Sequence, residues 1–370
     1  MEHAQIPLVL GGSSYDRGRQ HGCALRGWIR ESIARWKATL PHEYQLEPED
    51  VIERFLAATD FMPAIEAWSP GVLDEIRGIA EGADIGFEAV YVFQLLDELW
   101  NNSQAILGEH CTSIGAARAG EGRALVAQTI DVESFRDGYQ VVLHIQDSGS
   151  GMQAFLVGSA GGLGFNGMNS RGIGVCCNGM LQVSSASTGL PVACVVRGIL
   201  EQHTLQDAVS FVHRVPHASG QNYLVGSPEG VISLECSANC VVEIRPDMSS
   251  GVLGHTNHPL RTNDLLSWYR DALKSNDPHA FVVNSRARLS SLQRQLDAID
   301  DVTVDRLQDV LRSKDDAVHP ICSDGLPGEL YAEYGLMTFA ATIMDLSATP
   351  RLHVALGPPD RAPFLALGFQ

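Results

Sequence analysis

Hydrophobic residues recur at helical spacing over residues 15–100. In this stretch apolar side chains follow one another at steps of three and four, first at Leu25, Ile29, Ile33 and Trp36. Such a period places the apolar residues on one face of an amphipathic helix. The pattern therefore predicts a helix-rich N-terminal segment.

After Gly108 the pattern changes to short apolar runs that are separated by Gly, Ser, Asp and Asn. Runs of this length between turn residues are typical of β-strands. We expect strands at 124–127, 140–145, 154–157 and 172–177, a hairpin at 223–226 and 231–235, and two closing strands at 336–345 and 351–356.

Three further stretches show helical patterns. One helix is expected over 190–212, where Thr204 offers a cap, and others between 260 and 297 and over 304–312. Helix-rich and strand-rich stretches thus alternate in blocks rather than one by one. This order favours a layered α+β fold over a parallel βαβ sheet.

The net charge of the chain limits the kinds of ligand that are expected. The chain has 370 residues, of which 45% are hydrophobic, and 26 basic against 44 acidic side chains give a net charge of −18. This charge repels nucleic acids and anionic membrane surfaces, so small molecules or a protein partner are expected. The start of the chain has no signal-peptide pattern and no apolar run is long enough to span a membrane, which predicts a soluble cytoplasmic protein.

The cysteines and histidines do not indicate a metal site. The eight cysteines fit reduced thiols better than a disulfide framework, and Cys236 and Cys240 lack the paired spacing of zinc ligands. His255 and His258 could bind a metal together only on a helix, but Gly254 and Pro259 predict a strand end or loop. For His258 we expect hydrogen bonding at a strand end.

Cys111 is the strongest catalytic candidate, because it stands where the helical pattern gives way to the strand pattern. It follows His110 and precedes Thr112 and Ser113. A cysteine at such a junction can be a point of peptide-bond cleavage, and the α-amino group freed there can serve as the catalytic base.

Several motifs around and after Cys111 carry a family resemblance. The sequence Cys111-Thr112-Ser113, followed by a turn at 119–122 and by Gln128-Thr129-Ile130-Asp131, resembles the C-T-(S/T)... Q-N-x-D signature of the acyl-coenzyme A:6-aminopenicillanic acid acyltransferase family, peptidase family C45. Further matches occur in the family's order at 11–18, at 164–174 with Asn178, at 189–191 with Arg197, and at 255–258. The resemblance covers nearly the whole chain.

The resemblance implies an N-terminal-nucleophile hydrolase with a four-layer αββα sandwich. It also implies a precursor that cuts itself between His110 and Cys111. The products would be a helix-rich fragment of residues 1–110 and a strand-rich catalytic fragment of residues 111–370, which together form one αββα domain.

The resemblance also assigns roles to individual residues. Cys111 would be the nucleophile and Asp131 would orient its new amino group, while Asn178 and Asn257 match positions that hydrogen-bond the oxyanion and the amino terminus. Ser113 would assist the acyl shift. Thr112, Arg197 and His255 are expected at the substrate. Without the resemblance, Asp131 and Asn257 are also typical of turns and strand ends.

The implied enzyme is an amidohydrolase or acyltransferase of secondary metabolism. It would act on a small N-acyl compound or acyl thioester through a Cys111 acyl-enzyme, with no metal and no cofactor beyond a coenzyme A thioester as acyl donor. Its partners would be the acyl substrate and the other fragment of the same precursor. Two alternatives stay open: an uncleaved cysteine hydrolase in which Cys111 pairs with a histidine such as His255, and an unprocessed binding or scaffold protein of the same fold.

Overall fold

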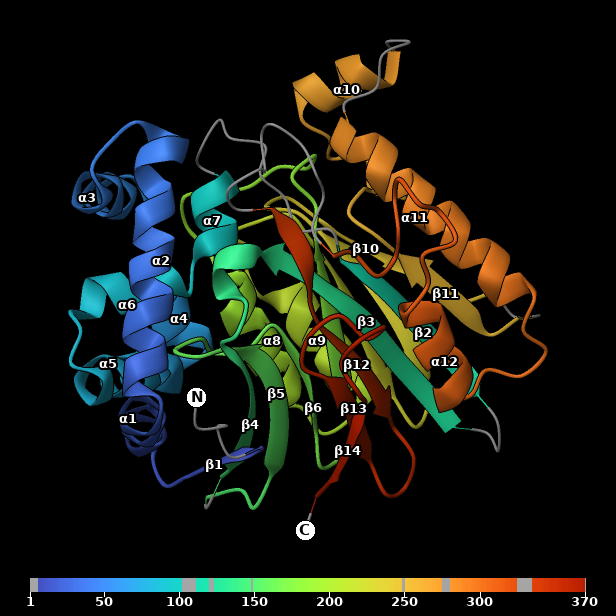
Figure 1. Cartoon of the computed structure of the whole chain (residues 1–370), viewed down its shortest axis with the longest axis horizontal. Coiled ribbons are helices and arrows are strands. Elements are labelled where there is room, and N and C mark those ends of the chain that lie inside the picture. Colours follow the sequence, from blue (N-terminus) through green and yellow to red (C-terminus); the bar gives the residue numbers. More distant parts are fainter. Residues whose placement is uncertain are drawn as a thin grey trace.

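The structure is a computed structural model that describes residues 6–101, 111–119, 123–147, 149–247, 250–274, 280–324 and 335–369. Within these residues the chain forms two β-sheets that are flanked by helices on both outer sides (Figure 1).

In both sheets, neighbouring strands are mainly antiparallel. The eight-stranded sheet has the order β1 (Leu8–Gly11), β4 (Gln140–Gln146), β5 (Gln153–Ser159), β6 (Asn166–Asn169), β7 (Gly174–Gly179), β8 (Gln221–Ser227), β9 (Gly230–Cys236), β10 (Val241–Ile244). The six-stranded sheet has the order β11 (Val252–His255), β2 (Thr112–Ala119), β3 (Arg123–Glu133), β12 (Leu336–Asp345), β13 (Arg351–Ala355), β14 (Leu365–Gly368). The pair of β1 with β4 is parallel.

The helices cover the outer faces of the sheets. On the eight-stranded sheet lie α1 (Ser14–Ala24), α2 (Arg26–Tyr44), α3 (Pro48–Ala58), α4 (Met62–Trp68), α5 (Pro70–Ala83), α6 (Phe87–Phe93), α7 (Leu96–Asn101), α8 (Val192–Leu200) and α9 (Leu205–Arg214). On the other side lie α11 (Ala280–Asp297) and α12 (Val304–Leu311), with α10 (Ser267–Lys274) beyond the start of α11 (Figure 1). A short 3-10 helix, Ser134–Arg136, follows β3.

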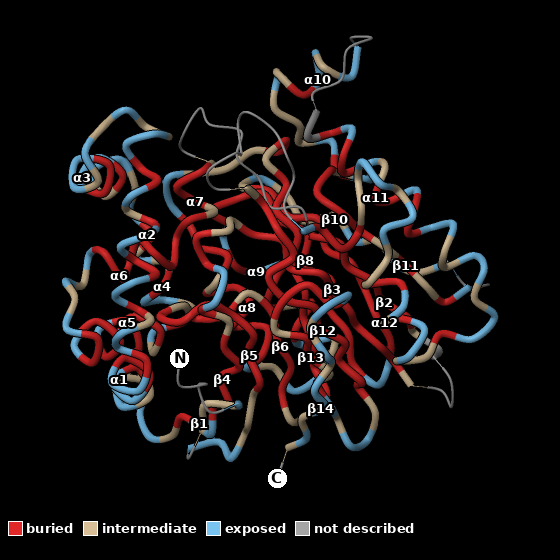
Figure 2. The backbone as a smooth tube through the Cα atoms, in the orientation of Figure 1, coloured by how far each residue is buried: buried red, intermediate tan, exposed pale blue. Residues whose placement is uncertain are grey.

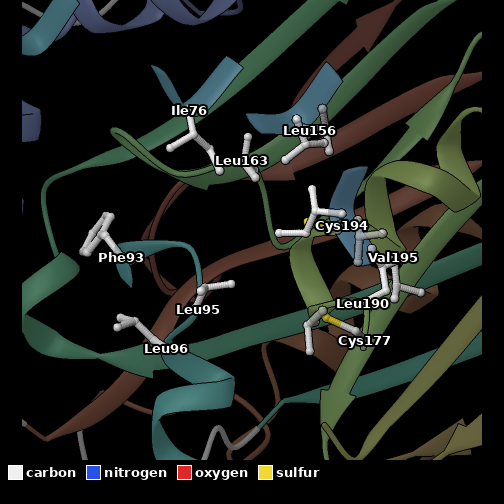
Figure 3. Packing of buried hydrophobic residues seen from close by; sticks show 14 of the residues in the cluster. Ile76, Phe93, Leu95, Leu96, Leu156, Leu163, Cys177, Leu190, Cys194 and Val195 are labelled. Carbon is white, nitrogen blue, oxygen red and sulfur yellow. The ribbon is translucent and has the colours of Figure 1, made fainter. Parts of the chain in front are cut away.

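Three apolar cores hold four layers together. The first joins the large helical layer to the eight-stranded sheet, and Figure 3 shows part of it, including Ile76, Phe93, Leu156 and Val195. The second fills the space between the sheets, and the third joins the six-stranded sheet to α11 and α12. Buried residues accordingly follow the sheets and the inner helix faces (Figure 2). The predicted αββα sandwich is confirmed.

Each inner strand lies between two apolar cores, and its successive side chains face these cores in alternation. On β3, Ala124 and Val126 belong to the core between the sheets, whereas Leu125 and Ala127 belong to the core under α11 and α12. Successive side chains of a strand point to opposite faces. The same alternation decides which layer each site residue of β2 and β3 faces.

Two helices of the N-terminal segment approach each other through glycines. A Cβ atom at Gly18 of α1 would lie 2.0 Å from the carbonyl oxygen of Glu75, and one at Gly78 of α5 would lie 2.3 Å from that of Tyr15. Gly22 and Gly82 continue the contact one turn further along each helix. Only a residue without a side chain permits backbones to approach this closely.

Two of the expected helices are divided. The stretch 190–212 forms α8 and α9, and Thr204 caps α9 by accepting a hydrogen bond from the Asp207 amide at 3.1 Å. In the stretch 260–297 the helices begin only at 267, because the backbone amides of residues 260–262 donate to the Glu235 carboxylate. Six strands lie outside the expected ones. β1, β6, β10, β11 and β14 have four residues each and are too short for an alternating pattern to be recognised, and the eight residues of β2 are mainly small side chains that give no strong apolar pattern.

Candidate active site

Cys111 is the residue immediately before β2, and it is 1% exposed. In the antiparallel pair of β2 with β3, Thr112 lies opposite Thr129. Cys111 therefore lies just beyond the last paired residue of β2. On β3, Ile130 and Asp131 follow Thr129, the last residue that pairs with β2. The other partner of the expected cleavage site, His110, lies outside the described residues.

Asp131 is a fully buried carboxyl group. Burial raises its pKa to about 7, although the guanidinium of Arg288 and the hydroxyl of Thr338, its neighbour on β12, lower it. Neither carboxylate oxygen accepts a hydrogen bond of normal geometry from the described residues. A buried carboxyl group without such hydrogen bonds would be stabilised in its ionised form by a nearby hydrogen-bond donor or cation.

Arg288 of α11 links several of these residues. Its guanidinium donates to the Cys111 carbonyl oxygen and the Thr112 Oγ1 at 2.8 Å each, and to the Asn257 Oδ1 at 2.9 Å. Its Nε donates to Asn284 at 2.8 Å. Burial lowers the pKa of Arg288 to about 10, against the opposing effect of Asp131 and Cys111.

Asn257 is held from several sides. Besides accepting from Arg288, its Nδ2 donates to the Gly179 carbonyl at 3.2 Å and its backbone amide donates to the Ser285 Oγ at 2.8 Å. The next residue, His258, lies with its Nδ1 2.7 Å from the same Ser285 hydroxyl. Both polar atoms of the Asn257 side chain are thus engaged, and this arrangement fixes the guanidinium that contacts Cys111.

Ser113 and Asn178 meet between the two sheets. The Ser113 hydroxyl donates to the Asn178 Oδ1 at 2.7 Å, and the Asn222 Nδ2 donates to the same oxygen at 3.2 Å. The Asn178 Nδ2 is buried and finds no hydrogen-bond partner among the described residues. A neutral amide donor held in this way can stabilise an oxyanion without adding a charge.

The pair of His255 and Glu235 lies in the same layer. His255, opposite Ser113 on β11, places its Nδ1 2.6 Å from the Thr256 carbonyl and its Nε2 3.0 Å from the Glu235 Oε1. Burial raises the pKa of Glu235, but the hydrogen bond and charge of His255 outweigh it and hold the pKa below its ordinary value. A carbonyl and a carboxylate only accept, so both ring nitrogens are occupied as donors.

These polar residues form two facing rows that run across the strands. Gln128, Ser113 and His255 stand side by side on β3, β2 and β11. Across from them stand Asn178, Asn222 and Glu235 on β7, β8 and β9. Every member is buried. Of the expected site residues, the structure brings Cys111, Thr112, Asp131 and Asn257 together around Arg288, and Ser113, Asn178 and His255 together between the sheets.

Arg197 lies elsewhere. Its guanidinium donates to both carboxylate oxygens of Glu75 on α5 at 2.8 Å, and both side chains are buried. Arg197 lines a cavity of about 690 Å³ between α1, α5, α8 and the β4–β5 hairpin, which none of Cys111, Asp131, Asn178 and Asn257 lines. The structure therefore does not bring Arg197 to Cys111.

Arg288, Asn222 and Glu235 are three site residues that no sequence motif predicts. Arg288 carries a weak signal, because it shares a helix face with Ser285 and Leu292, both of which are fully buried. A charged residue on an apolar helix face is a candidate for a functional pair. Asn222 and Glu235 are placed only by the register of β8 and β9 and have no local signature.

The αββα sandwich is of the N-terminal-nucleophile hydrolase type, and it holds a buried cysteine immediately before an inner strand and a buried aspartate near the end of the next strand. The chain belongs to the acyl-coenzyme A:6-aminopenicillanic acid acyl-transferase family, whose model matches residues 118–332, more than half of the chain. This match includes Asp131, Asn178, Asn257 and Arg288, while Cys111 lies shortly before it. Membership in an acyl-transferase family indicates that the chain is an enzyme.

Among solved structures, the chain is similar to a variant of the conjugated bile acid hydrolase from Clostridium perfringens. The identity is 13% and the TM-score 0.44, with 70% of this chain and 97% of that chain covered. It is also similar to penicillin V acylase from Agrobacterium tumefaciens, at 12% identity and a TM-score of 0.40, with 67% and 84% covered.

Within the described residues, no helix combines the length and the apolar character that crossing a membrane requires.

Proposed function

We propose that this chain is a self-processing cysteine N-terminal-nucleophile enzyme that hydrolyses or transfers the acyl group of a small N-acyl compound or acyl thioester. The observation that carries the proposal is the buried carboxyl group of Asp131. Its oxygens accept no hydrogen bond of normal geometry from the described residues, and both Asp131 and Cys111 lie beside the Arg288 guanidinium. A free α-amino group at Cys111 would supply that donor. The intact peptide bond does not.

Processing would begin when the Cys111 thiol attacks the carbonyl carbon of His110. A C–S bond forms, the C–N bond breaks, and the thiol proton passes to the leaving amine. Water then hydrolyses the thioester, which frees the His110 carboxylate and restores the thiol. The hydrogen bond of Arg288 to the Cys111 carbonyl oxygen supports this step, because it fixes the backbone on one side of the bond to be cut.

Catalysis would use the new amine as the base. An α-amino group has an ordinary pKa of about 7.7–8.0, and the nearby Arg288 guanidinium favours its neutral form while Asp131 orients it. The amine takes the thiol proton, and the thiolate attacks the acyl carbon of the substrate. The Asn178 Nδ2 would donate to the oxyanion, and the leaving amine or thiol receives the proton. Water or a second amine then takes the acyl group from Cys111.

The alternative with a Cys–His pair is less consistent with the geometry. Both ring nitrogens of His255 are engaged, by the Thr256 carbonyl and by Glu235, so neither is available to take a proton from a thiol. An uncleaved chain that still turns over substrate would nevertheless favour this alternative.

The experiment is an intact-mass measurement on freshly purified protein under denaturing conditions. We expect fragments of residues 1–110 and 111–370 in the wild type and a single chain in Cys111→Ala. Cys194→Ala is the matched control, because it removes a buried thiol from α8, away from the site, and we expect it to be cleaved normally. A single chain in the wild type would contradict self-processing. If that chain were also inert toward acyl substrates, the scaffold alternative would hold.

A further inference from the structure

The Asn178 side chain can lie in two orientations that differ by an exchange of its oxygen and its nitrogen. In the structure its Oδ1 receives two donors, the Ser113 hydroxyl at 2.7 Å and the Asn222 Nδ2 at 3.2 Å. Its Nδ2 is left buried and without a partner. In this orientation the atom that remains without a partner is an N–H donor, and in the other it would be the carbonyl oxygen.

The orientation of the Asn222 side chain is set by a residue of β9. Its Oδ1 accepts from the Ser233 hydroxyl of β9 at 2.5 Å. Asn222 also lies opposite Asn178 in the register of β7 with β8. Ser233, Asn222 and Asn178 are all buried, at 1%, 0% and 0% exposure, so water does not compete for these bonds. The donors run in one direction, from Ser233 to Asn222 to Asn178.

We infer that Asn222 is a positioning residue of the candidate oxyanion hole, which holds the Asn178 amide so that its Nδ2 faces the reacting acyl oxygen. This inference rests on the proposed function. It adds a residue that has no place in the motifs of the sequence and that does not touch the nucleophile in any described hydrogen bond.

Replacing the Asn222 donor changes the preferred orientation of Asn178. In Asn222→Asp an ionised carboxylate would face Asn178, and the Asn178 amide would turn to donate to it. Its oxygen would then face the oxyanion. Because loss of one oxyanion donor lowers kcat by about 10²–10³-fold, we expect a loss in this range. Asn222→Leu removes the donor without reversing the preference, so we expect a smaller loss of about tenfold.

The test uses cleaved enzyme and a series of 4-nitrophenyl esters from acetate to dodecanoate, together with 4-nitrophenyl phenylacetate. Release of 4-nitrophenol gives kcat and KM. In parallel, the rate of Cys111 alkylation by iodoacetamide is followed by mass. Alkylation is a displacement at a saturated carbon and forms no oxyanion. We therefore expect kcat to fall in both variants while KM and the alkylation rate stay within about twofold of the wild type.

Asn169→Asp is the matched control, since Asn169 is buried in β6 and donates to the Leu200 and Gln202 carbonyls, away from the two facing rows. We expect its kcat to stay at the wild-type level. Ser233→Ala, which removes the anchor of Asn222 but no group near Asn178, should lower kcat by less than Asn222→Asp. It also carries the test if Asn222→Asp is not cleaved or does not fold.

The outcomes separate the two proposals. No ester hydrolysis by the wild type above the level of Cys111→Ala would overturn the proposed function. Wild-type activity together with unchanged kcat in Asn222→Leu and Ser233→Ala would overturn the positioning role alone. A parallel loss of alkylation and hydrolysis would also overturn it, because it would mean general damage to the site.

Discussion

Arg288 connects residues that lie far apart in the sequence. It forms four hydrogen bonds, to the Cys111 carbonyl, Thr112, Asn257 and Asn284. A guanidinium carries five N–H donors in a fixed plane, so a lysine could not reproduce this geometry. Removing it would leave several buried acceptors without a donor at once.

Asp131 makes the stability of the intact chain fall as the pH rises toward neutral. Its pKa in the folded chain, about 7, lies above its ordinary value near 3.8, so the folded state holds the proton longer than the unfolded state. Folded stability is therefore lost as the pH rises through this window. In the uncleaved Cys111→Ala background, we expect Asp131→Asn to remove about 2–3 kcal/mol of pH dependence between pH 5 and pH 8.

Urea unfolding at each pH measures this difference. The baseline stability of Asp131→Asn can fall, since Arg288 loses a neighbouring charge, but the slope with pH is the quantity to compare. Asp300→Asn, at an exposed position, is the control and should keep the slope of its parent. Equal slopes for Asp131→Asn and its parent would contradict the raised pKa.

At the scale of elements, the glycine contact between α1 and α5 brings two helix backbones close together. Gly18 and Gly22 face Gly78 and Gly82, with backbone atoms where side chains would otherwise stand. The sequence motif at 11–18 contributes Gly18 to this contact. Part of the family resemblance at the N-terminal end therefore reflects packing, with no link to chemistry in the described contacts.

We expect Gly78→Ala to destabilise the protein by at least about 2 kcal/mol, because the new methyl group would collide with the Tyr15 carbonyl oxygen and force the helices apart. Gly27→Ala of α2 is the control, since no atom lies within 4 Å of the added group. Its stability should be unchanged or slightly higher. Thermal unfolding followed by circular dichroism tests both, and equal melting temperatures for the two variants would refute the close approach.

At the scale of the whole molecule, the helical layer is also joined to the eight-stranded sheet by buried polar contacts. The His21 Nε2 of α1 accepts from the Gly161 amide at 3.0 Å, and Gln94 bonds both the Gly161 carbonyl and the Leu163 amide. Burial lowers the pKa of His21 to about 4, with Glu75 raising it and Arg197 lowering it to a smaller extent. This contact requires a neutral ring.

Acid should therefore weaken the attachment of this layer. Below pH 6.5 the unfolded chain protonates His21 while the folded chain does not, so stability falls as the pH drops toward 4. We expect His21→Gln, which keeps an acceptor for Gly161, to reduce the loss of stability between pH 6.5 and pH 4 by about 2–3 kcal/mol. The exposed His42→Gln serves as the control in the same unfolding series. An unchanged pH dependence in His21→Gln would argue against a neutral buried histidine.

The helix-rich and strand-rich blocks could be predicted because helical spacing and short apolar runs are local patterns, whereas the four-layer order was implied by the family resemblance. Cys111 and Asp131 could be predicted together because they belong to one motif that spans two neighbouring strands. The sequence could not place Arg288, which is 177 residues from Cys111, or Asn222, because their neighbours are set by strand register and by the docking of α11. Arg197 matched a motif, yet its position is explained by its pair with Glu75.

The apolar core between the large helical layer and the eight-stranded sheet would also join the two fragments after a cut before Cys111. Among the residues described above, every side chain around Arg288 and in the two facing rows follows Cys111 in the chain. Residues before it contribute β1, which pairs with β4, and the inner faces of α1–α7, which share one core with the eight-stranded sheet (Figure 3). The two pieces would thus form a heterodimer that comes from a single translation product, in which the piece before the cut supplies α1–α7 of the helical layer over the eight-stranded sheet.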